Sequence, residues 1–352
     1  MQAVRCIKQF ANMPAMPRAS DAAPAKFAVG TFASPERSAF AGLVLDGRVA
    51  SLETHLGAGV TVRSLLEEWD RSLERLERLA QALSPDDCEH RLEELRPLPP
   101  VQPPGQLFQA GANYRQHLVQ LMSAADERMH HLMSAKERER ELARLDERAA
   151  SGDPYVFVGV PYSLAGARDE IVLPAAVSQP DWELELAAVI GQSARNVPAE
   201  RALQVIAGYT ICNDITARDR VYRPDLRGIG TDWLAGKNWP TFSPVGPYIV
   251  PSKQIPDPHD LRLTLRLNGR VMQDASTADM MFGIARLIEY VTSITELRPG
   301  DLLLTGSPAG NGVHHGRFLR PGDVLEGEIT GLGRQRNRCV AEAARQGIAS
   351  VS

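Results

Sequence analysis

Two glutamates lie one residue apart in an otherwise apolar segment. Glu183 and Glu185 alternate there with Trp182, Leu184 and Leu186. Side chains along a β-strand point alternately to its two faces, so the segment predicts both carboxylates on one face and the apolar side chains on the other. Acids in such a strand are costly to bury without a cation. A hard divalent metal is the simplest partner for them, and a solvent-facing edge strand is the alternative.

A third acid follows the next strongly apolar segment, 31 residues after Glu183. Asp214 ends the run 206–214 and precedes Arg218. With the two glutamates it would complete an all-oxygen site suited to Mg²⁺, Mn²⁺ or Ca²⁺. On spacing alone, a turn or a helix cap before Arg218 explains Asp214 equally well.

Lys237 and His117 are candidates for oxyanion and acid–base chemistry. Lys237 lies among tryptophan and proline residues, and its ammonium group near a metal could stabilise a developing oxyanion. His117 precedes a long charged segment and could act as a general base. The ordinary alternatives are a solvated lysine and a structural or exposed histidine. Two histidine pairs are predicted to be exposed rather than metal ligands: His130-His131 and His314-His315.

Composition favours small-molecule chemistry. The chain has 352 residues, 43% of them hydrophobic, and a net charge of -4, which gives no general attraction to nucleic acid or to anionic membranes. No segment approaches the roughly 18 apolar residues of a membrane span. The four cysteines are widely spaced, without a C-x-x-C pair, so we expect them to be reduced and mostly buried. These features predict a cytoplasmic protein.

The first third of the chain predicts a small domain. Residues 1–22 lack the apolar core of a secretory signal and are expected to form a flexible tail. Strands are predicted over 26–32 and 39–52, the second turning at Asp46-Gly47, and an amphipathic helix over 62–83. A proline-rich linker ends this α+β domain, so we assign it residues 23–104.

The remainder, residues 105–345, predicts a β-rich catalytic domain. Many short strands follow one another, with the strongest hairpin signal at Asn268-Gly269. Helices are predicted over 199–205 and 280–297. The segment 118–153 is dense in charged residues and should be helical, either as a solvated surface pair or as a mobile lid. The pattern indicates an α+β protein with a barrel-like or rolled sheet.

Taken in order, these segments resemble the fumarylacetoacetate hydrolase family over about residues 105 to 340. No single motif would suffice, but their shared order is highly specific. The matching pieces are Gly111-Ala112-Asn113-Tyr114 with His117, Glu183-Leu184-Glu185-Leu186, Asn213-Asp214-Ile215-Thr216-Ala217-Arg218-Asp219, Lys237, Pro244-Val245-Gly246-Pro247, Asn268-Gly269, Pro299-Gly300-Asp301, Thr305-Gly306-Ser307-Pro308 and Pro321-Gly322-Asp323.

The resemblance implies a mixed β-roll catalytic domain that forms a homodimer. It implies that Glu183, Glu185 and Asp214 hold Mg²⁺ or a similar ion, and that the substrate is a small 2-oxo acid or 1,3-dicarbonyl compound. Further roles follow by the same analogy: substrate contacts for Lys237 and Thr305, the pocket wall for Tyr114 and Arg218, and a lid for the segment after His117.

On this basis we expect hydrolysis of a carbon–carbon bond in an acylpyruvate-like compound, with His117 activating water and Lys237 stabilising the enolate. The chain departs from the family at two positions. Gln120 replaces a common glutamate and can orient His117 but not stabilise its protonated form. Val221 replaces a common glutamine. A decarboxylase, hydratase or isomerase, or a non-catalytic binding protein, therefore stays open as an alternative.

Overall fold

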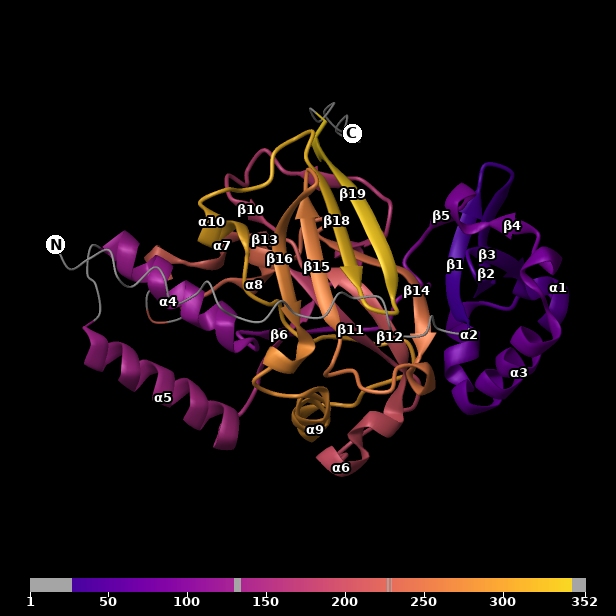
Figure 1. The fold of residues 1–352 in the computed structure, drawn as a ribbon, viewed down its shortest axis with the longest axis horizontal. Helices are drawn as coiled ribbons and strands as arrows, with labels where there is room; N and C mark the ends of the chain where they lie inside the picture. Colours follow the sequence, from indigo (N-terminus) through magenta and orange to yellow (C-terminus); the bar gives the residue numbers. More distant parts are fainter. Residues whose placement is uncertain (1–26, 130–133, 227, 229, 344–352) are drawn as a thin grey trace, which may run out of the picture.

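The N-terminal strands and helices gather at one end of the molecule (Figure 1). The structure is a computed structural model that describes residues 27–129, 134–226, 228 and 230–343. The elements of this unit are β1 (Ala28–Ser34), β2 (Arg37–Leu45), β3 (Arg48–Ser51), α1 (Leu52–Leu56), α2 (Val62–Glu67), α3 (Trp69–Ala82), β4 (His90–Arg91) and β5 (Arg96–Pro97). The Asp46-Gly47 turn joins β2 to β3 as predicted.

The predicted helix over residues 62–83 is interrupted at Glu68. The backbone of Glu68 has φ −128° and ψ 48°, outside the helical region, so α2 ends before it and α3 begins after it. Leu66 and Trp69 are both buried across this break, and the Trp69 ring lies close to Gly191. The apolar period therefore identified the buried face but not the interruption.

One mixed sheet of twelve strands carries the acids. Its order is β4-β3-β2-β1-β14-β12-β11-β17-β6-β7, with β5 beside β1 and β8 beside β14. The strands not yet given are β6 (Leu107–Gly111), β7 (Tyr155–Gly159), β8 (Leu164–Gly166), β11 (Leu184–Ile190), β12 (Ile206–Asn213), β14 (Ser243–Pro251) and β17 (Leu302–Leu304). β11 is antiparallel to both of its neighbours, whereas β17 and β6 are parallel. The N-terminal unit joins this sheet where Val29 pairs with Ile249.

A five-stranded sheet packs against the central strands. Its order is β16-β15-β18-β19-β9. Its strands are β9 (Ile171–Leu173), β15 (Arg262–Leu267), β16 (Arg270–Ser276), β18 (Val324–Ile329) and β19 (Gly333–Ala341); β10 (Pro180–Asp181) and β13 (Thr216–Ala217) form a separate pair. Asn268 and Gly269, with φ 52° and 80°, turn β15 into β16 as predicted. Leu184 and Leu186 share a buried cluster with Leu263 and Leu265, which confirms the predicted apolar face of β11.

The remaining helices of the described residues all follow Tyr114 in the chain. They are α4 (Arg115–Met129), α5 (Ala135–Ser151), α6 (Ala199–Ala202), α7 (Arg218–Val221), α8 (Trp233–Lys237), α9 (Ile284–Ile294) and α10 (Gly312–His315). The helices predicted over 199–205 and 280–297 are shorter than expected. Figure 1 shows α4 and α5 at the end of the molecule away from the N-terminal unit. α5 has no buried residue. It contacts the rest of the chain through an ion pair between Arg115 and Asp146 at 2.8 Å and a hydrogen bond from Arg148 to the carbonyl oxygen of Ala112 at 3.2 Å.

These elements confirm the predicted β-rich α+β class with a rolled mixed sheet. In the residues that the structure describes, no helix has both the length and the apolar character needed to cross a bilayer. Three cysteines, Cys88, Cys212 and Cys339, are buried and free. The predicted tail, Cys6 and the pair His130-His131 lie outside the described residues.

Candidate metal and active site

Glu183 and Glu185 lie at the start of β11, within the twelve-stranded sheet. Glu185 belongs to the strand and Glu183 immediately precedes it. Only 7% and 1% of their respective surfaces are exposed. β11 has a hydrogen-bonded strand on each side, so a solvent-facing edge strand is the wrong interpretation of this pair. The alternation predicted from the sequence places the two carboxylates together because residues two apart in a strand share a face.

Asp214 follows β12 directly and lies beside Glu183. Its N–H donates to the carbonyl oxygen of Glu183 at 2.8 Å, continuing the register in which Glu185 pairs with Cys212. Glu183, Glu185 and Asp214 each offer a carboxylate oxygen within 4.8 Å of the others. Asp214 is not a helix cap, since its carboxylate bonds to Lys237 and Gln109. The three predicted ligands therefore form one buried cluster.

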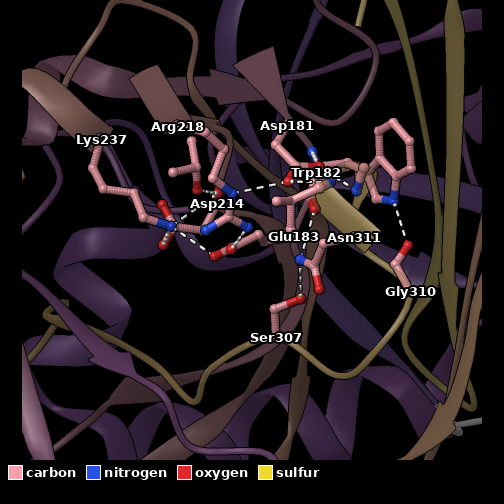
Figure 2. Close-up of polar contacts among 12 residues, drawn as sticks. Asp181, Trp182, Glu183, Asp214, Arg218, Lys237, Ser307, Gly310 and Asn311 are labelled. Atoms are coloured by element: carbon pink, nitrogen blue, oxygen red, sulfur yellow. Dashed lines mark hydrogen bonds and ion pairs between the residues drawn. The ribbon is translucent and has the colours of Figure 1, made fainter. Parts of the chain in front are cut away.

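The ammonium group of Lys237 lies inside this acid cluster (Figure 2). Its Nζ donates to Oε2 of Glu183 at 2.7 Å, and to Oδ2 and the carbonyl oxygen of Asp214 at 2.6 and 3.2 Å. The side chain comes from the last residue of α8, whose first turn is capped by Asp232 accepting the N–H of Ala235 at 3.0 Å. Lys237 is 3% exposed, so the solvated alternative is wrong.

Arg218 reaches the acids from the first residue of α7. Its Nε donates to Oδ2 of Asp181 at 2.8 Å, and its Nη2 bonds to Oε1 of Glu183 (Figure 2). Asp181 is fully buried and also accepts the N–H groups of Gly312 at 2.5 Å and Val313 at 3.1 Å. Sequence reasoning missed Asp181, because all its partners except the adjacent N–H of Trp182 lie 37 to 132 residues away. An acid at the start of an apolar segment was the available signal.

Burial and neighbouring charges change the pKa values of the three acids in different directions. Burial acts to raise the pKa of Glu183, but Arg218 and Lys237 together lower it to about 2. Burial and the charge of Asp214 raise the pKa of Glu185 well above its usual value. Burial likewise raises the pKa of Asp214 to about 6, although Lys237 opposes this. Glu185, which has no ion pair among the described residues, is thus the hardest of the three acids to ionise.

The buried cluster has more acids than bases. Its ionisable groups are Asp181, Glu183, Glu185, Asp214, Lys237 and Arg218. When all four carboxyl groups are ionised, their negative charges exceed the positive charges of Lys237 and Arg218 by two, and buried charge is costly unless it is paired. A divalent ion would supply the two missing positive charges, and carboxylate oxygens are its preferred ligands. The residues present therefore fit a hard divalent cation.

His117 is buried on α4, within electrostatic range of these charges. Burial is the main cause that lowers its pKa to about 4, with Glu183 acting in the opposite direction. The ring is therefore neutral near pH 7, the form that a general base requires. Gln120 lies one turn further along α4, and its Oε1 accepts the N–H of Gly310 at 2.8 Å. No hydrogen bond of the described residues joins Gln120 to His117, so Gln120 ties α4 to the segment after β17 instead.

Tyr114 and Thr305, expected to contact substrate, are both fully buried beside the acids. Burial and the carboxylate of Glu185 raise the pKa of Tyr114 well above its usual value. Oγ1 of Thr305 donates to the carbonyl oxygen of Leu186 at 2.9 Å, so its proton is already engaged. Asn113 donates to the carbonyl oxygen of Thr305 at 2.8 Å and thereby joins the two segments.

The segment after β17 supports the cluster through its backbone. Gly306 donates its N–H to Oε2 of Glu185 at 2.7 Å. Its φ of 94° suits glycine, and a Cβ there would lie 2.9 Å from the Cβ of Asn113. Asn311, a second residue that sequence reasoning missed, donates to the carbonyl oxygen of Trp182 at 3.0 Å. As predicted, His314 and His315 are exposed.

Known proteins resemble this chain in sequence. Two curated relatives are the 2,4-didehydro-3-deoxy-L-rhamnonate hydrolase of Sphingomonas sp., 41% identical over 191 residues, and a human mitochondrial oxaloacetate tautomerase, 39% identical over 190 residues. Each match covers 53% of this chain, and 65% and 59% of the respective relative. The chain thus spans about three-fifths of these relatives.

Solved structures and family models agree with that similarity. A fumarylacetoacetate hydrolase from Exiguobacterium antarcticum superposes with a TM-score of 0.68 at 26% identity, covering 90% of this chain and 100% of that one. The model of the fumarylacetoacetate hydrolase C-terminal domain matches residues 106–340, which include all the predicted site residues. The chain belongs to the fumarylacetoacetate hydrolase family.

Proposed function

We propose that this protein is a divalent-metal-dependent hydrolase that cleaves a carbon–carbon bond in a 1,3-dicarbonyl or acylpyruvate-type 2-oxo acid. The observation that carries the proposal is the buried cluster of Glu183, Glu185 and Asp214, with the Lys237 ammonium group bonded to it and a neutral His117 in electrostatic range. The related hydrolase from Sphingomonas sp. supports the reaction class.

In this proposal Glu183, Glu185 and Asp214 hold Mg²⁺, or else Mn²⁺ or Ca²⁺. The unbalanced negative charge of the buried cluster supports a divalent ion there. When bound, such an ion polarises the oxygens of a 2-oxo acid and stabilises enolate charge. Lys237 and Arg218 would remain beside the acids as fixed positive charges that favour an anionic substrate.

The chain's own groups would carry out the proton transfers. His117 would take a proton from water as the water oxygen adds to the distal carbonyl carbon of the substrate. The bond from that carbon to its neighbour then breaks, and the electron pair leaves as an enolate beside Lys237. The proton that His117 took from water is then returned to the enolate carbon and completes the product. Tyr114, Arg218 and Thr305 would line the pocket, and α4 with α5 would close over it as a lid that excludes bulk water.

Tautomerisation or isomerisation of a 2-oxo acid is the second candidate reaction. Gln120 favours it, because this residue is an amide that bonds to Gly310, and no hydrogen bond or ion pair of the described residues joins His117 to a carboxylate. Moving a proton next to a carbonyl needs a base and oxyanion stabilisation but no activated water. The related human tautomerase supports this alternative.

A single assay separates these reactions. We expect an acylpyruvate with Mg²⁺ to yield pyruvate and the corresponding carboxylic acid, seen as loss of the enol absorbance and release of pyruvate. Ketonisation without pyruvate release would identify a tautomerase instead. Glu183→Ala should abolish either reaction, and turnover that persists in chelator would refute metal dependence. Oxalate binding without any turnover would identify a binding protein.

We further propose that the protein acts as a homodimer in the cytoplasm. Large exposed apolar side chains support self-association, among them Tyr162 at 92% and Leu234 at 69% exposure. The free, buried cysteines of the described residues suit a reducing compartment. Sedimentation velocity of the full chain would test the dimer.

A further inference from the structure

A buried amide contacts the carboxylate oxygen of Asp214 that Lys237 leaves unused. Nε2 of Gln109 donates to Oδ1 of Asp214 at 2.7 Å, whereas Lys237 bonds to Oδ2. Gln109 is 1% exposed and belongs to β6, which β17 and β11 separate from β12 in the sheet. Three strand spacings of about 4.8 Å separate β6 from β12, so this hydrogen bond joins segments that do not pair with each other in the sheet.

The same amide has an acceptor that it does not use. Oε1 of Gln109 is buried without a hydrogen-bond partner in the described part of the chain. It lies against Gly159 of β7, where a Cβ would be only 2.4 Å from it. Burying an unpaired polar atom costs about 1–3 kcal/mol, a penalty that an apolar side chain of the same shape would avoid. Solubility and packing therefore do not explain a glutamine here, but its bond to Asp214 does.

A neutral donor has an advantage at this position. A lysine or arginine beside Oδ1 would orient Asp214 equally well, but its positive charge would repel an incoming cation. An amide fixes the direction of the carboxylate and leaves its negative charge available. Partners that orient ligands in this way commonly change metal affinity by about 10- to 100-fold when they are removed.

We propose that Gln109 is a positioning residue that fixes the Asp214 carboxylate for cation binding, and that Gly159 leaves the space in which its amide sits. This inference rests on the proposed metal site. It assigns no chemical step to Gln109, which acts only through Asp214.

The test is calorimetric titration of Mn²⁺ into the full chain after treatment with chelator. Gln109→Met keeps the length of the side chain but removes the donor, and should raise the Kd for Mn²⁺ about tenfold or more. Gln106→Met is the matched control. The Gln106 side chain, from the same part of the chain, donates to the carbonyl oxygen of Gly159 at 3.0 Å and has no hydrogen bond to an acid of the buried cluster. Its Kd should stay within twofold of the unchanged protein.

Gly159→Ala perturbs the same amide from the neighbouring strand. The new methyl group should displace the Gln109 side chain and raise the Kd for Mn²⁺. The double variant with Gln109→Met should have the same Kd as the single variants. If Gln109→Met fails to fold, the Kd of Gly159→Ala alone tests the role of Gln109. A Kd within twofold of the unchanged protein in either folded single variant would overturn the proposal. Absence of Mn²⁺ binding by the unchanged protein would instead overturn the proposed metal site itself.

Discussion

The backbone N–H of Gly306 is the hydrogen-bond donor to Glu185, at 2.7 Å from Oε2. No ion pair of the described residues includes this buried carboxyl group, although its neighbours Glu183 and Asp214 both bond to Lys237. Glu185 is therefore the acid whose ionisation depends most on a bound cation.

Glu185→Gln should stabilise the metal-free protein while removing cation binding. Burial raises the pKa of Glu185, so its ionised form destabilises the fold as the pH rises above the ordinary value of 4.5. The neutral amide should raise the free energy of unfolding at pH 7 by about 1–3 kcal/mol. Mn²⁺ affinity should fall by about 100-fold. Denaturant unfolding and calorimetry measure the two effects.

Glu328→Gln is the control for this change, since Glu328 is exposed and paired with Arg334. It should alter neither quantity by a measurable amount. A metal-free Glu185→Gln protein that is less stable than the unchanged chain would contradict the account of the buried charge.

The acid side of the pH–rate profile should have its midpoint near pH 4. Burial lowers the pKa of His117 from 6.5 to about 4, so the ring stays neutral until that pH is reached. His117→Asn should reduce kcat by about 100- to 10,000-fold and remove this limb. A midpoint near 6.5 would mean that a solvated group, not the buried His117, is the base. The same shift implies that stability is lost as the pH falls from 6.5 towards 4.

Gln120→Glu should favour hydrolysis over tautomerisation. A carboxylate can still accept the N–H of Gly310, and residues three apart on a helix lie close enough for its charge to raise the pKa of His117. We expect the acid limb to move to higher pH and the ratio of pyruvate release to ketonisation to increase. Gln120→Met cannot accept the N–H of Gly310. Comparison with this variant therefore separates the effect of the added charge from the effect of losing the hydrogen bond. An unchanged product ratio in Gln120→Glu would exclude a role for this position in choosing the reaction.

Asp181→Asn should be strongly destabilising. It leaves Arg218, whose side chain is 18% exposed, with an amide where the fully buried carboxylate of Asp181 accepted its Nε–H. Breaking a buried ion pair costs about 3–5 kcal/mol. Asp274→Asn breaks an ion pair with Arg262 that is about one-third exposed and should cost about 1 kcal/mol or less. Denaturant unfolding of both variants compares the costs, and equal losses would show that Asp181 has no special role.

Local patterns were sufficient to predict that Glu183, Glu185 and Asp214 lie together. Glu183 and Glu185 alternate with apolar residues in one strand, and Asp214 ends the next, so two short segments contain all three candidate ligands. The turns at Asp46-Gly47 and Asn268-Gly269 were predictable for the same reason, because a turn depends on the residues within it.

Contacts between distant segments could not be predicted in this way. Asp181, Gln109 and Asn311 are polar residues in apolar surroundings, and their partners lie about 100 residues or more away for most of their bonds. The hydroxyl group of Thr305 donates to the carbonyl oxygen of Leu186 across the sheet, a contact that the sequence did not predict. These hydrogen-bond partners depend on the register between strands, and the sequence of one segment alone does not determine that register.

The hydrogen bond between Gln120 and Gly310 joins the helix that carries His117 to the segment that supports Glu185 and Asp181. Helix docking and ligand binding at the acids are therefore linked equilibria. A ligand that binds more tightly when α4 is docked must strengthen that docking by the same factor. Protection of α4 from hydrogen exchange would consequently report substrate affinity without any turnover.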